Sequence, residues 1–312
     1  MKKVLCLGLT PALQRTLVFE RLTIDEVNRA GQVVESAAGK ALNTARALVK
    51  LGTEALTAGF NGGATGGRVA EYLKSYGVGN ALTVMPSETR ICTTLLNQAD
   101  GSVTELVEEA PEPEARLLKR FVRDNRVLTA QAAMLVISGT LPPFAADDFY
   151  VTFVQKATRA GVPVVIDSHK AALINVLFER PFIAKLNVRE MQMTLQQPMH
   201  SEQRILRGMR DLRGMGAQNV VVTQGGGFAY LLTAQGIFRY LPPQTPKYIN
   251  AIGSGDCVTA GIVHAVLQGK EVSAALRYGL ACGSANVECL TPADFDPRRV
   301  TALLRGIEIT RL

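Results

Sequence analysis

The sequence predicts an α/β fold in which helices cover both faces of a doubly wound, mostly parallel sheet and a small second β-sheet lies apart from it. Two observations support this prediction. Short apolar runs alternate with helical patterns along most of the chain, as they do in successive βαβ units. Two stretches, 15–36 and 89–107, show strand-like alternation without helices. The 312 residues contain no repeat and no low-complexity linker, so we expect a single domain, 1–312.

The main sheet is expected from six short runs rich in Val, Ile, Leu and Ala. In chain order, these predicted strands are 4–9, 55–59, 133–138, 162–167, 182–185 and 219–223. Periodic apolar patterns predict helices at 40–51, 67–76, 114–129, 145–160, 171–178, 202–213, 258–267 and 274–287. Gly52 is expected to end the first of these helices. Pro111-Glu112-Pro113 marks the return of the chain to the main sheet.

Composition argues against several classes of protein. No apolar run reaches the roughly 18 residues that span a bilayer, and the N-terminal run is expected to be a buried strand and not a signal peptide. We therefore expect a cytoplasmic protein without a membrane partner. The five cysteines lack CxxC spacing and are expected to be reduced core residues. The net charge of +7 suits anionic substrates, but the positive charges are dispersed, so we expect no nucleic-acid partner.

Sequence motifs of three other enzyme classes are missing. The chain has no G-x-x-x-x-G-K-[ST] of a P-loop kinase and no G-x-S-x-G of a hydrolase. No G-x-G-x-x-G follows the first predicted strand, which weakens a nicotinamide-binding interpretation. The three histidines are far apart and lack the spacing of metal ligands.

The stretch from Asn250 to Cys257, Asn-Ala-Ile-Gly-Ser-Gly-Asp-Cys, is the most informative in the chain. Its small residues let the backbone approach a ligand, and the apolar run that follows predicts a helix with unpaired N–H groups at its start. Gly253, Ser254 and Gly255 would then form an anion site suited to a phosphate. Asp256 would take a proton from an attacking hydroxyl. A glycine-containing turn with Asp256 as a helix cap explains the same residues, so this segment alone leaves both interpretations open.

A second segment, Ala38-Gly39-Lys40-Ala41-Leu42-Asn43, opens the helix that Gly52 ends, and a glycine-rich stretch at 62–66 follows the next strand. Together with the later Gly-Ser-Gly-Asp, this spacing resembles the paired signatures of the ribokinase-like sugar kinases. Within them it is similar to the phosphofructokinase-B branch, which includes fructose-1-phosphate and tagatose-6-phosphate kinases. Shorter matches lie in order between the two signatures: Val-Asn-Arg at 27–29, Glu-Thr-Arg at 88–90, Ser-Gly-Thr-Leu-Pro at 138–142, Lys-Leu-Asn-Val-Arg-Glu at 185–190 and Thr-Gln-Gly at 223–225.

The resemblance runs from Thr10 to at least Asn286 and implies phosphoryl transfer from ATP with Mg²⁺. It also implies that segments of about 12–37 and 88–108 form a lid over the sugar, and that a homodimer forms through this lid. Asp256 would be the general base, and the N–H groups of Gly253, Ser254, Gly255 and Asp256 would hold the charge on the γ-phosphoryl group.

The nucleotide side of the site follows from the same resemblance. ATP and Mg²⁺ would be bound by Lys185, Asn187, Glu190, Thr223, Gly225, Gly227 and Asn286. Asn187 and Glu190 would organise the metal through water or phosphate, and Asn286 would approach the adenine. Purely structural interpretations remain open for all of them. They are a helix cap with a first-turn acid at 187–190, a strand-end lysine at 185, a glycine hairpin at 223–227 and a polar helix position at 286.

On the sugar side, the resemblance assigns contacts with sugar hydroxyls to Gly39, Asn43 and Thr140. It offers Arg90, Arg29 and Lys40 as cations for a phosphate already present on the substrate. Arg90 matches best, because it lies in the Glu-Thr-Arg context and arginine can bind a phosphate through two hydrogen bonds.

Two departures from the family pattern concern the substrate and a cation. Gln14 stands where relatives usually have an Asp that accepts hydrogen bonds from two sugar hydroxyls, whereas a neutral Gln both donates and accepts. Asn250 and Ala251 alter the loop that binds a monovalent cation in some relatives, so a requirement for such a cation is left open.

We therefore expect an ATP- and Mg²⁺-dependent kinase of a ketohexose monophosphate, such as fructose 6-phosphate, fructose 1-phosphate or tagatose 6-phosphate. A kinase of an unphosphorylated sugar or nucleoside is the alternative within this class. It gains support if Arg90 and Lys40 face away from the sugar pocket. A non-catalytic sugar-phosphate sensor on the same fold is the alternative from another class.

Overall fold

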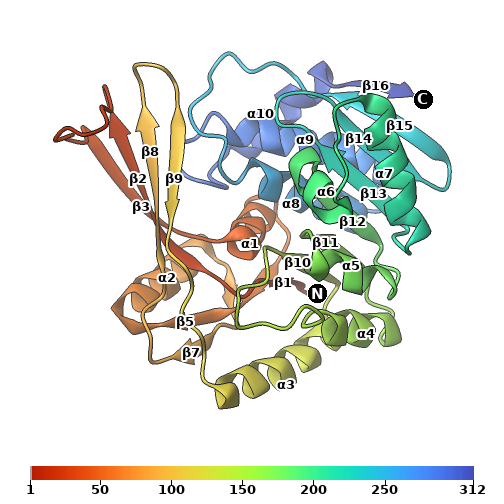
Figure 1. Ribbon diagram of the computed structural model, residues 1–312, viewed down its shortest axis with the longest axis horizontal. Helices are drawn as coiled ribbons and strands as arrows, with labels where there is room; N and C mark the ends of the chain where they lie inside the picture. Colours follow the sequence, from red (N-terminus) through yellow and green to blue (C-terminus); the bar gives the residue numbers. More distant parts are fainter. Residues whose placement is uncertain (1) are drawn as a thin grey trace.

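The computed structural model describes residues 2–312 and has a ten-stranded main sheet (Figure 1). From one edge to the other its strands are β16 (Glu308–Arg311), β15 (Gly236–Leu241), β14 (Ala229–Thr233), β13 (Asn219–Thr223), β12 (Ile183–Asn187), β11 (Val164–Asp167), β10 (Met134–Ser138), β1 (Val4–Leu7), β4 (Ala55–Ala58) and β6 (Gly79–Asn80). The seven strands from β13 to β6 are parallel to one another. The predicted α/β class is confirmed, and all six predicted strands are present.

Helices cover both faces of this sheet, and side chains alternate between two apolar cores. In β1, Val4 and Cys6 face one core while Leu5 and Leu7 face the other, as the two-residue period of a strand requires. The first core packs on α1 (Lys40–Lys50), α2 (Gly63–Tyr76), α8 (Ser254–Leu267), α9 (Val272–Asn286) and α10 (Pro297–Leu303), which leads into the short 3₁₀ helix η1 (Leu304–Gly306). The second packs on α3 (Ala115–Gln131), α4 (Val151–Arg159), α5 (Ala171–Leu177), α6 (Val188–Leu195) and α7 (Glu202–Gly214).

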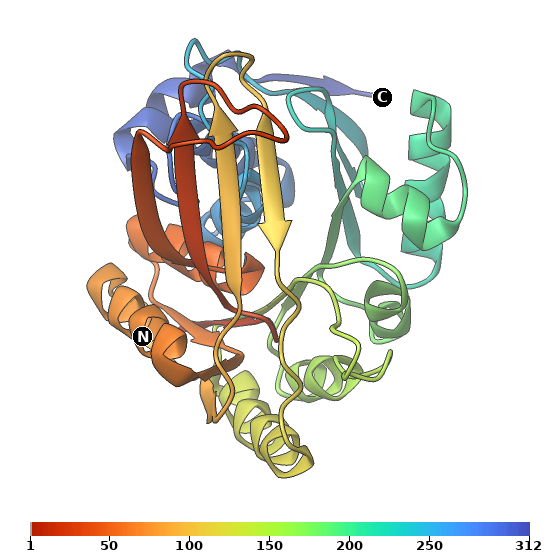
Figure 2. The ribbon, with the colours of Figure 1, turned by 60° about the vertical axis from the view of Figure 1, so that its left-hand side comes forward.

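A separate four-stranded sheet stands beside the main sheet and projects past it (Figure 2). Its strands, in order, are β3 (Gln32–Ala38), β2 (Ala12–Phe19), β8 (Ile91–Asn97) and β9 (Val103–Val107). The central pair β2 and β8 is parallel, and both outer pairs are antiparallel. These strands fall within the segments 12–37 and 88–108 expected to form a lid, apart from the last residue of β3, and we call this sheet the lid. A further small pair, β5 (Phe60–Gly62) and β7 (Thr83–Met85), lies at its base (Figure 1).

The fold differs from the prediction in the start of one helix and in several elements that were not predicted, among them β5, β6, β7 and α10. The expected helix 145–160 begins only at Val151. Before it, the carbonyls of Pro142, Ala146 and Asp148 each accept a hydrogen bond from the N–H group three residues further along the chain, so this stretch forms successive turns. The antiparallel strands β14, β15 and β16 were not predicted. β16 is exposed along its whole length and pairs with β15, which lies far upstream in the sequence, so its own residues carry little apolar signal.

Among residues 2–312, no helix is both long enough and apolar enough to span a bilayer. The five cysteines are free thiols, and four of them are buried.

Candidate active site

A pocket of about 520 Å³ lies between the lid and the carboxyl ends of the parallel strands. Gly8, Ser138 and Asn187, at or just beyond the ends of β1, β10 and β12, line its floor. The chain order of the strands runs in opposite directions on the two sides of β1 and β10. In open α/β sheets such a reversal is where ligands bind, because the connections diverge and leave a crevice.

Asp256 lies in the first turn of α8, directly after a glycine turn. Gly253 caps this helix with φ +80°, and a Cβ there would come within 2.6 Å of Pro292 Cβ, so the turn needs glycine. Gly255 and Asp256 are the second and third residues of the helix, so their N–H groups have no acceptor within it. The turn therefore presents unpaired N–H donors and one carboxylate to the same pocket.

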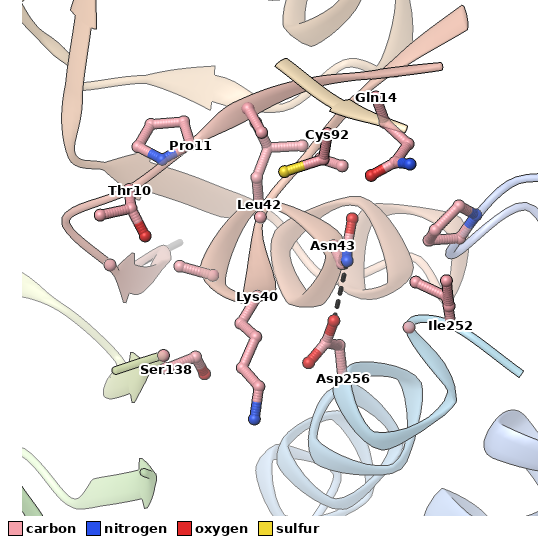
Figure 3. Close-up of a pocket in the computed structure, with 18 of the residues that line it drawn as sticks. Thr10, Pro11, Gln14, Lys40, Leu42, Asn43, Cys92, Ser138, Ile252 and Asp256 are labelled. Atoms are coloured by element: carbon pink, nitrogen blue, oxygen red, sulfur yellow. Dashed lines mark hydrogen bonds between the residues drawn. The ribbon is translucent and has the colours of Figure 1, made fainter. Parts of the chain in front are cut away.

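The Asp256 carboxylate is 5 % exposed and is held by Asn43 of α1, whose Nδ2 donates to Asp256 Oδ2 at 2.8 Å (Figure 3). Burial raises the pKa of Asp256 to about 6, although the Lys40 ammonium and the Asn43 hydrogen bond act in the opposite direction. A carboxylate with this pKa is ionised at neutral pH yet basic enough to accept a proton.

The start of α1 places three predicted residues beside Asp256. Gly39 is the helix cap with φ +116°, and a Cβ on it would lie 3.1 Å from Pro11 Cα, where the chain enters the lid. Lys40 extends away from Gln14 and Cys92 of the lid (Figure 3). Its Nζ lies 3.1 Å from Glu190 Oε1 and 3.6 Å from Asp167 Oδ1. Asp167 contributes most to raising the pKa of Lys40, so the ammonium stays charged.

Asp167, which the sequence analysis missed, is a buried anion at the centre of this charged group. Lys185 Nζ and Thr259 Oγ1 each donate to its Oδ2 at 2.7 Å. Burial alone would raise the pKa of Asp167, but the Lys185 and Lys40 ammonium groups lower it to about 2. Its position as the last residue of a predicted parallel strand was the signal that could have identified it.

Asn187 and Glu190 form a capping box at the start of α6. Asn187 Oδ1 accepts from the Glu190 N–H at 2.8 Å, and Glu190 Oε2 accepts from the Asn187 N–H at 2.8 Å. The structural interpretation of this pair is therefore correct, and both residues also line the pocket. Glu190 Oε1 is the atom that faces Lys40.

The other residues predicted to bind the nucleotide do not line the pocket. Lys185 is 3 % exposed and close to α8, since a Cβ on Gly255 would lie 3.6 Å from its Nζ. Thr223, Gly225 and Gly227 lie at the turn of the β13–β14 hairpin, outside the pocket lining.

Asn286 requires a correction to the expected adenine contact. It is 1 % exposed, and its Nδ2 donates to Ile252 O at 2.9 Å and to Ser254 Oγ at 3.0 Å. Its Oδ1 accepts from Ala293 N at 2.7 Å. With its polar atoms engaged in this way, Asn286 braces the loop before α8 and presents nothing to an adenine ring.

Gln14 and Arg90 line the pocket from the lid, and Thr140 lines it from the loop after β10. Gln14 is 2 % exposed, and its Nε2 donates to Thr94 Oγ1 at 2.8 Å. Arg29 is exposed in the β2–β3 connection and does not line the pocket. The structure thus brings most of the predicted sugar-side residues together and leaves Arg29 outside.

A model of the pfkB family carbohydrate kinases matches residues 1–298. The chain belongs to this family. It is accordingly an ATP-dependent phosphotransferase of the carbohydrate kinase type.

Solved structures of phosphofructokinases and of a ribokinase share this fold along nearly the whole chain. A possible 1-phosphofructokinase from Thermotoga maritima is 20 % identical, with a TM-score of 0.92 and 99 % of both chains covered. Phosphofructokinase-2 from Escherichia coli, solved in complex with potassium, is 21 % identical, with a TM-score of 0.89 and 98 % and 99 % of the two chains covered. Ribokinase from Arabidopsis thaliana, complexed with ribose and ATP, is 19 % identical, with a TM-score of 0.79 and 97 % and 99 % covered. At these identities the likeness establishes the fold.

The raised pKa of Asp256 predicts the pH dependence of this pfkB kinase. If Asp256 acts as the base it must be deprotonated, so kcat/KM should fall as pH drops through about 6. The measurement is a pH profile with a neutral sugar acceptor and saturating nucleotide, because a sugar phosphate itself titrates near pH 6. A profile that stays flat from pH 5 to pH 7 would contradict the assignment.

Proposed function

We propose that this kinase transfers the γ-phosphoryl group of ATP to a hydroxyl group of a small sugar, with Asp256 as the general base. The observation that supports this most strongly is the geometry of Asp256. It is a buried carboxylate in the pocket, held by Asn43 and placed at the unpaired N–H groups of α8. A non-catalytic sensor would have no need for a carboxylate at an anion site, because the two repel each other.

Each residue near Asp256 would have a separate role in the phosphoryl transfer. Asn43 orients the Asp256 carboxylate, which accepts the proton of the sugar hydroxyl. The hydroxyl oxygen then bonds to the γ-phosphorus while the bond from that phosphorus to the bridging oxygen breaks, and ADP leaves. The N–H groups of Gly255 and Asp256 stabilise the charge on the transferring phosphoryl group. The side-chain nitrogens of Lys40 and Lys185 lie close to this point, and each is paired with the buried carboxylate of Asp167.

The donor set at Glu190 and Asn187 fits a Mg²⁺ ion that is held mainly by nucleotide phosphates and water. No group of three or more His, Cys, Asp or Glu side chains within residues 2–312 could enclose a metal alone. Mg²⁺ in nucleotide sites typically takes one or two carboxylates together with phosphates. Glu190 would supply this carboxylate, and the bound ion would neutralise charge on the phosphates.

The class of acceptor depends on the cations at the sugar end. A ketohexose monophosphate needs cations there, and Arg90 lines the pocket. The Lys40 ammonium is directed to Glu190 and Asp167, away from the lid, and Arg29 lies outside the pocket. Of the two possible acceptors, a ketohexose monophosphate and an unphosphorylated sugar, this arrangement favours the unphosphorylated sugar. A screen for ADP release over sugars and sugar phosphates, with the product identified by mass spectrometry, tests both; absence of turnover with every acceptor would overturn the proposed activity.

Replacing Arg90 with Ala tests whether the acceptor is a ketohexose monophosphate. If Arg90 binds a substrate phosphate, the change should raise KM for a sugar phosphate roughly ten- to a hundredfold through loss of a charge-assisted hydrogen bond, with little effect on KM for ATP. KM values for fructose 6-phosphate, fructose and ATP are compared in the same assay. Arg29→Ala is the matched control, because it removes the same charge outside the pocket. Equal effects on the sugar phosphate and on ATP would count against a phosphate contact.

Two further expectations remain proposals. A homodimer through the lid is supported by apolar side chains exposed on this sheet, Val33 and Leu106, and sedimentation equilibrium would test it.

A monovalent cation near Asn250 would make the rate depend on potassium. The rate would then change when sodium replaces potassium at constant ionic strength.

A further inference from the structure

Glu105 of β9 puts a carboxylate into the lid wall of the pocket, where the predicted site had none. It pairs with Thr94 of β8, and Thr94 is the residue to which Gln14 donates its amide. Residues two apart on a strand share a face. Glu105 and Val107 therefore both reach the pocket from the same strand. The lid wall thus combines the neutral Gln14 with a carboxylate from a different strand.

The oxygens of Glu105 are available to a ligand. Within residues 2–312 its carboxylate makes no hydrogen bond shorter than 3.5 Å and no ion pair shorter than 4.0 Å. The residue as a whole is exposed, yet burial of its carboxyl raises its pKa, and Arg90 acts in the opposite direction.

Arg90, the cation nearest to this carboxylate, is partly engaged with the protein itself. Its Nη2 donates to Thr10 O at 3.0 Å and its Nη1 to Glu108 O at 3.2 Å, while its Nε is buried without a partner. The lid end of the pocket therefore offers one guanidinium and one carboxylate. For a phosphate dianion, the attraction of the guanidinium is offset by the repulsion of the carboxylate. A hydroxyl can donate to the carboxylate and accept from the guanidinium, so it satisfies both.

We propose that Glu105 is a specificity-determining residue that accepts a hydrogen bond from a hydroxyl of a neutral sugar and disfavours an acceptor with a phosphate at the lid end. The inference rests on the proposed function and names the class of its acceptor. Recognition of this kind combines an attractive contact with a repulsive one against the competitor. Glu105 would also supply a carboxylate to the lid wall, where the residue at position 14 is the neutral Gln14.

The test compares neutral and phosphorylated members of matched pairs, namely fructose with fructose 6-phosphate and with fructose 1-phosphate, and tagatose with tagatose 6-phosphate. The wild-type protein should prefer the neutral member in kcat/KM. Glu105→Gln should shift the neutral-to-phosphate ratio at least about tenfold toward the phosphate, since it removes both the charged acceptor and the repulsion. Glu105→Arg should shift it further. Glu109→Gln, an equal charge change at an exposed residue outside the pocket lining, is the control.

Calorimetric binding of the same sugars to wild type and variants separates this inference from the proposed activity. Absence of turnover with every acceptor would overturn the activity, while dissociation constants would still report on Glu105. Tight binding of a sugar phosphate to the wild type, unchanged in Glu105→Gln, would overturn the role of Glu105. So would a shift no larger than that in Glu109→Gln.

Discussion

Asp256→Asn is expected to lower kcat by roughly 10²–10⁴-fold, the usual contribution of a general base. Asn keeps the size and polarity of Asp and can still accept the hydrogen bond from Asn43, but it cannot take a proton. Binding of ATP should change little. The measurement is steady-state kinetics with the best acceptor, together with the dissociation constant of ATP.

The stability of this variant provides an internal control. Burial raises the pKa of Asp256 above its unfolded value, so the stability it contributes is present in the protonated form and is lost as pH rises through about 6. At pH 7.5, the neutral Asn should therefore leave Tm unchanged or raise it. Asp147→Asn, at an exposed residue, controls for loss of a surface charge. A variant that folds and turns over near the wild-type rate would exclude Asp256 as the base.

Asp167→Asn is expected to destabilise the protein by about 3–5 kcal/mol, because removing one partner leaves a buried charge uncompensated. Lys185 is 3 % exposed, and its ammonium lies 2.7 Å from Asp167 Oδ2. The same change removes one of the two carboxylates paired with Lys40 and leaves Glu190. Urea denaturation at pH 7 gives the change in the free energy of unfolding.

Asp124→Asn is the matched control for this experiment. It removes a carboxylate from exposed pairs with Arg120 and Arg123, and such pairs contribute about 1 kcal/mol or less. Because the pKa of Asp167 is lowered to about 2, its stabilising effect should be present above its unfolded pKa, near 4, and disappear as pH falls toward 2. A loss of stability no greater than that of Asp124→Asn would show that Asp167 and Lys185 are not a tightly coupled pair.

The sequence predicted best where a short segment carries its own physical signal. Each predicted strand of the main sheet is an apolar run buried on both faces, and each was found. Gly253 and Asp256 could be recognised together because a left-handed turn, a helix start and an acid in the first turn occupy only four residues. The lid also followed from local alternation, although its register did not.

Long-range contacts set the limits of that prediction. Asn43 and Asp256 were each predicted as site residues, but their hydrogen bond joins positions 213 residues apart. Asn286 was predicted near an adenine, and only its hydrogen bond to Ile252, 34 residues away in the sequence, shows that it braces the turn before α8.

The sequence by itself therefore determined the α/β architecture and the glycine turn that places Asp256 at the start of a helix, because these depend on propensity and spacing within a few residues. Only the tertiary structure decided which charges meet. It paired Lys40 and Lys185 with Asp167. It also joined Asp167 by a hydrogen bond to Thr259, which lies 92 residues away in the sequence. It also brought Glu105 across the lid sheet into the pocket. The interaction of two charges depends on their separation and burial, and the folded chain sets both.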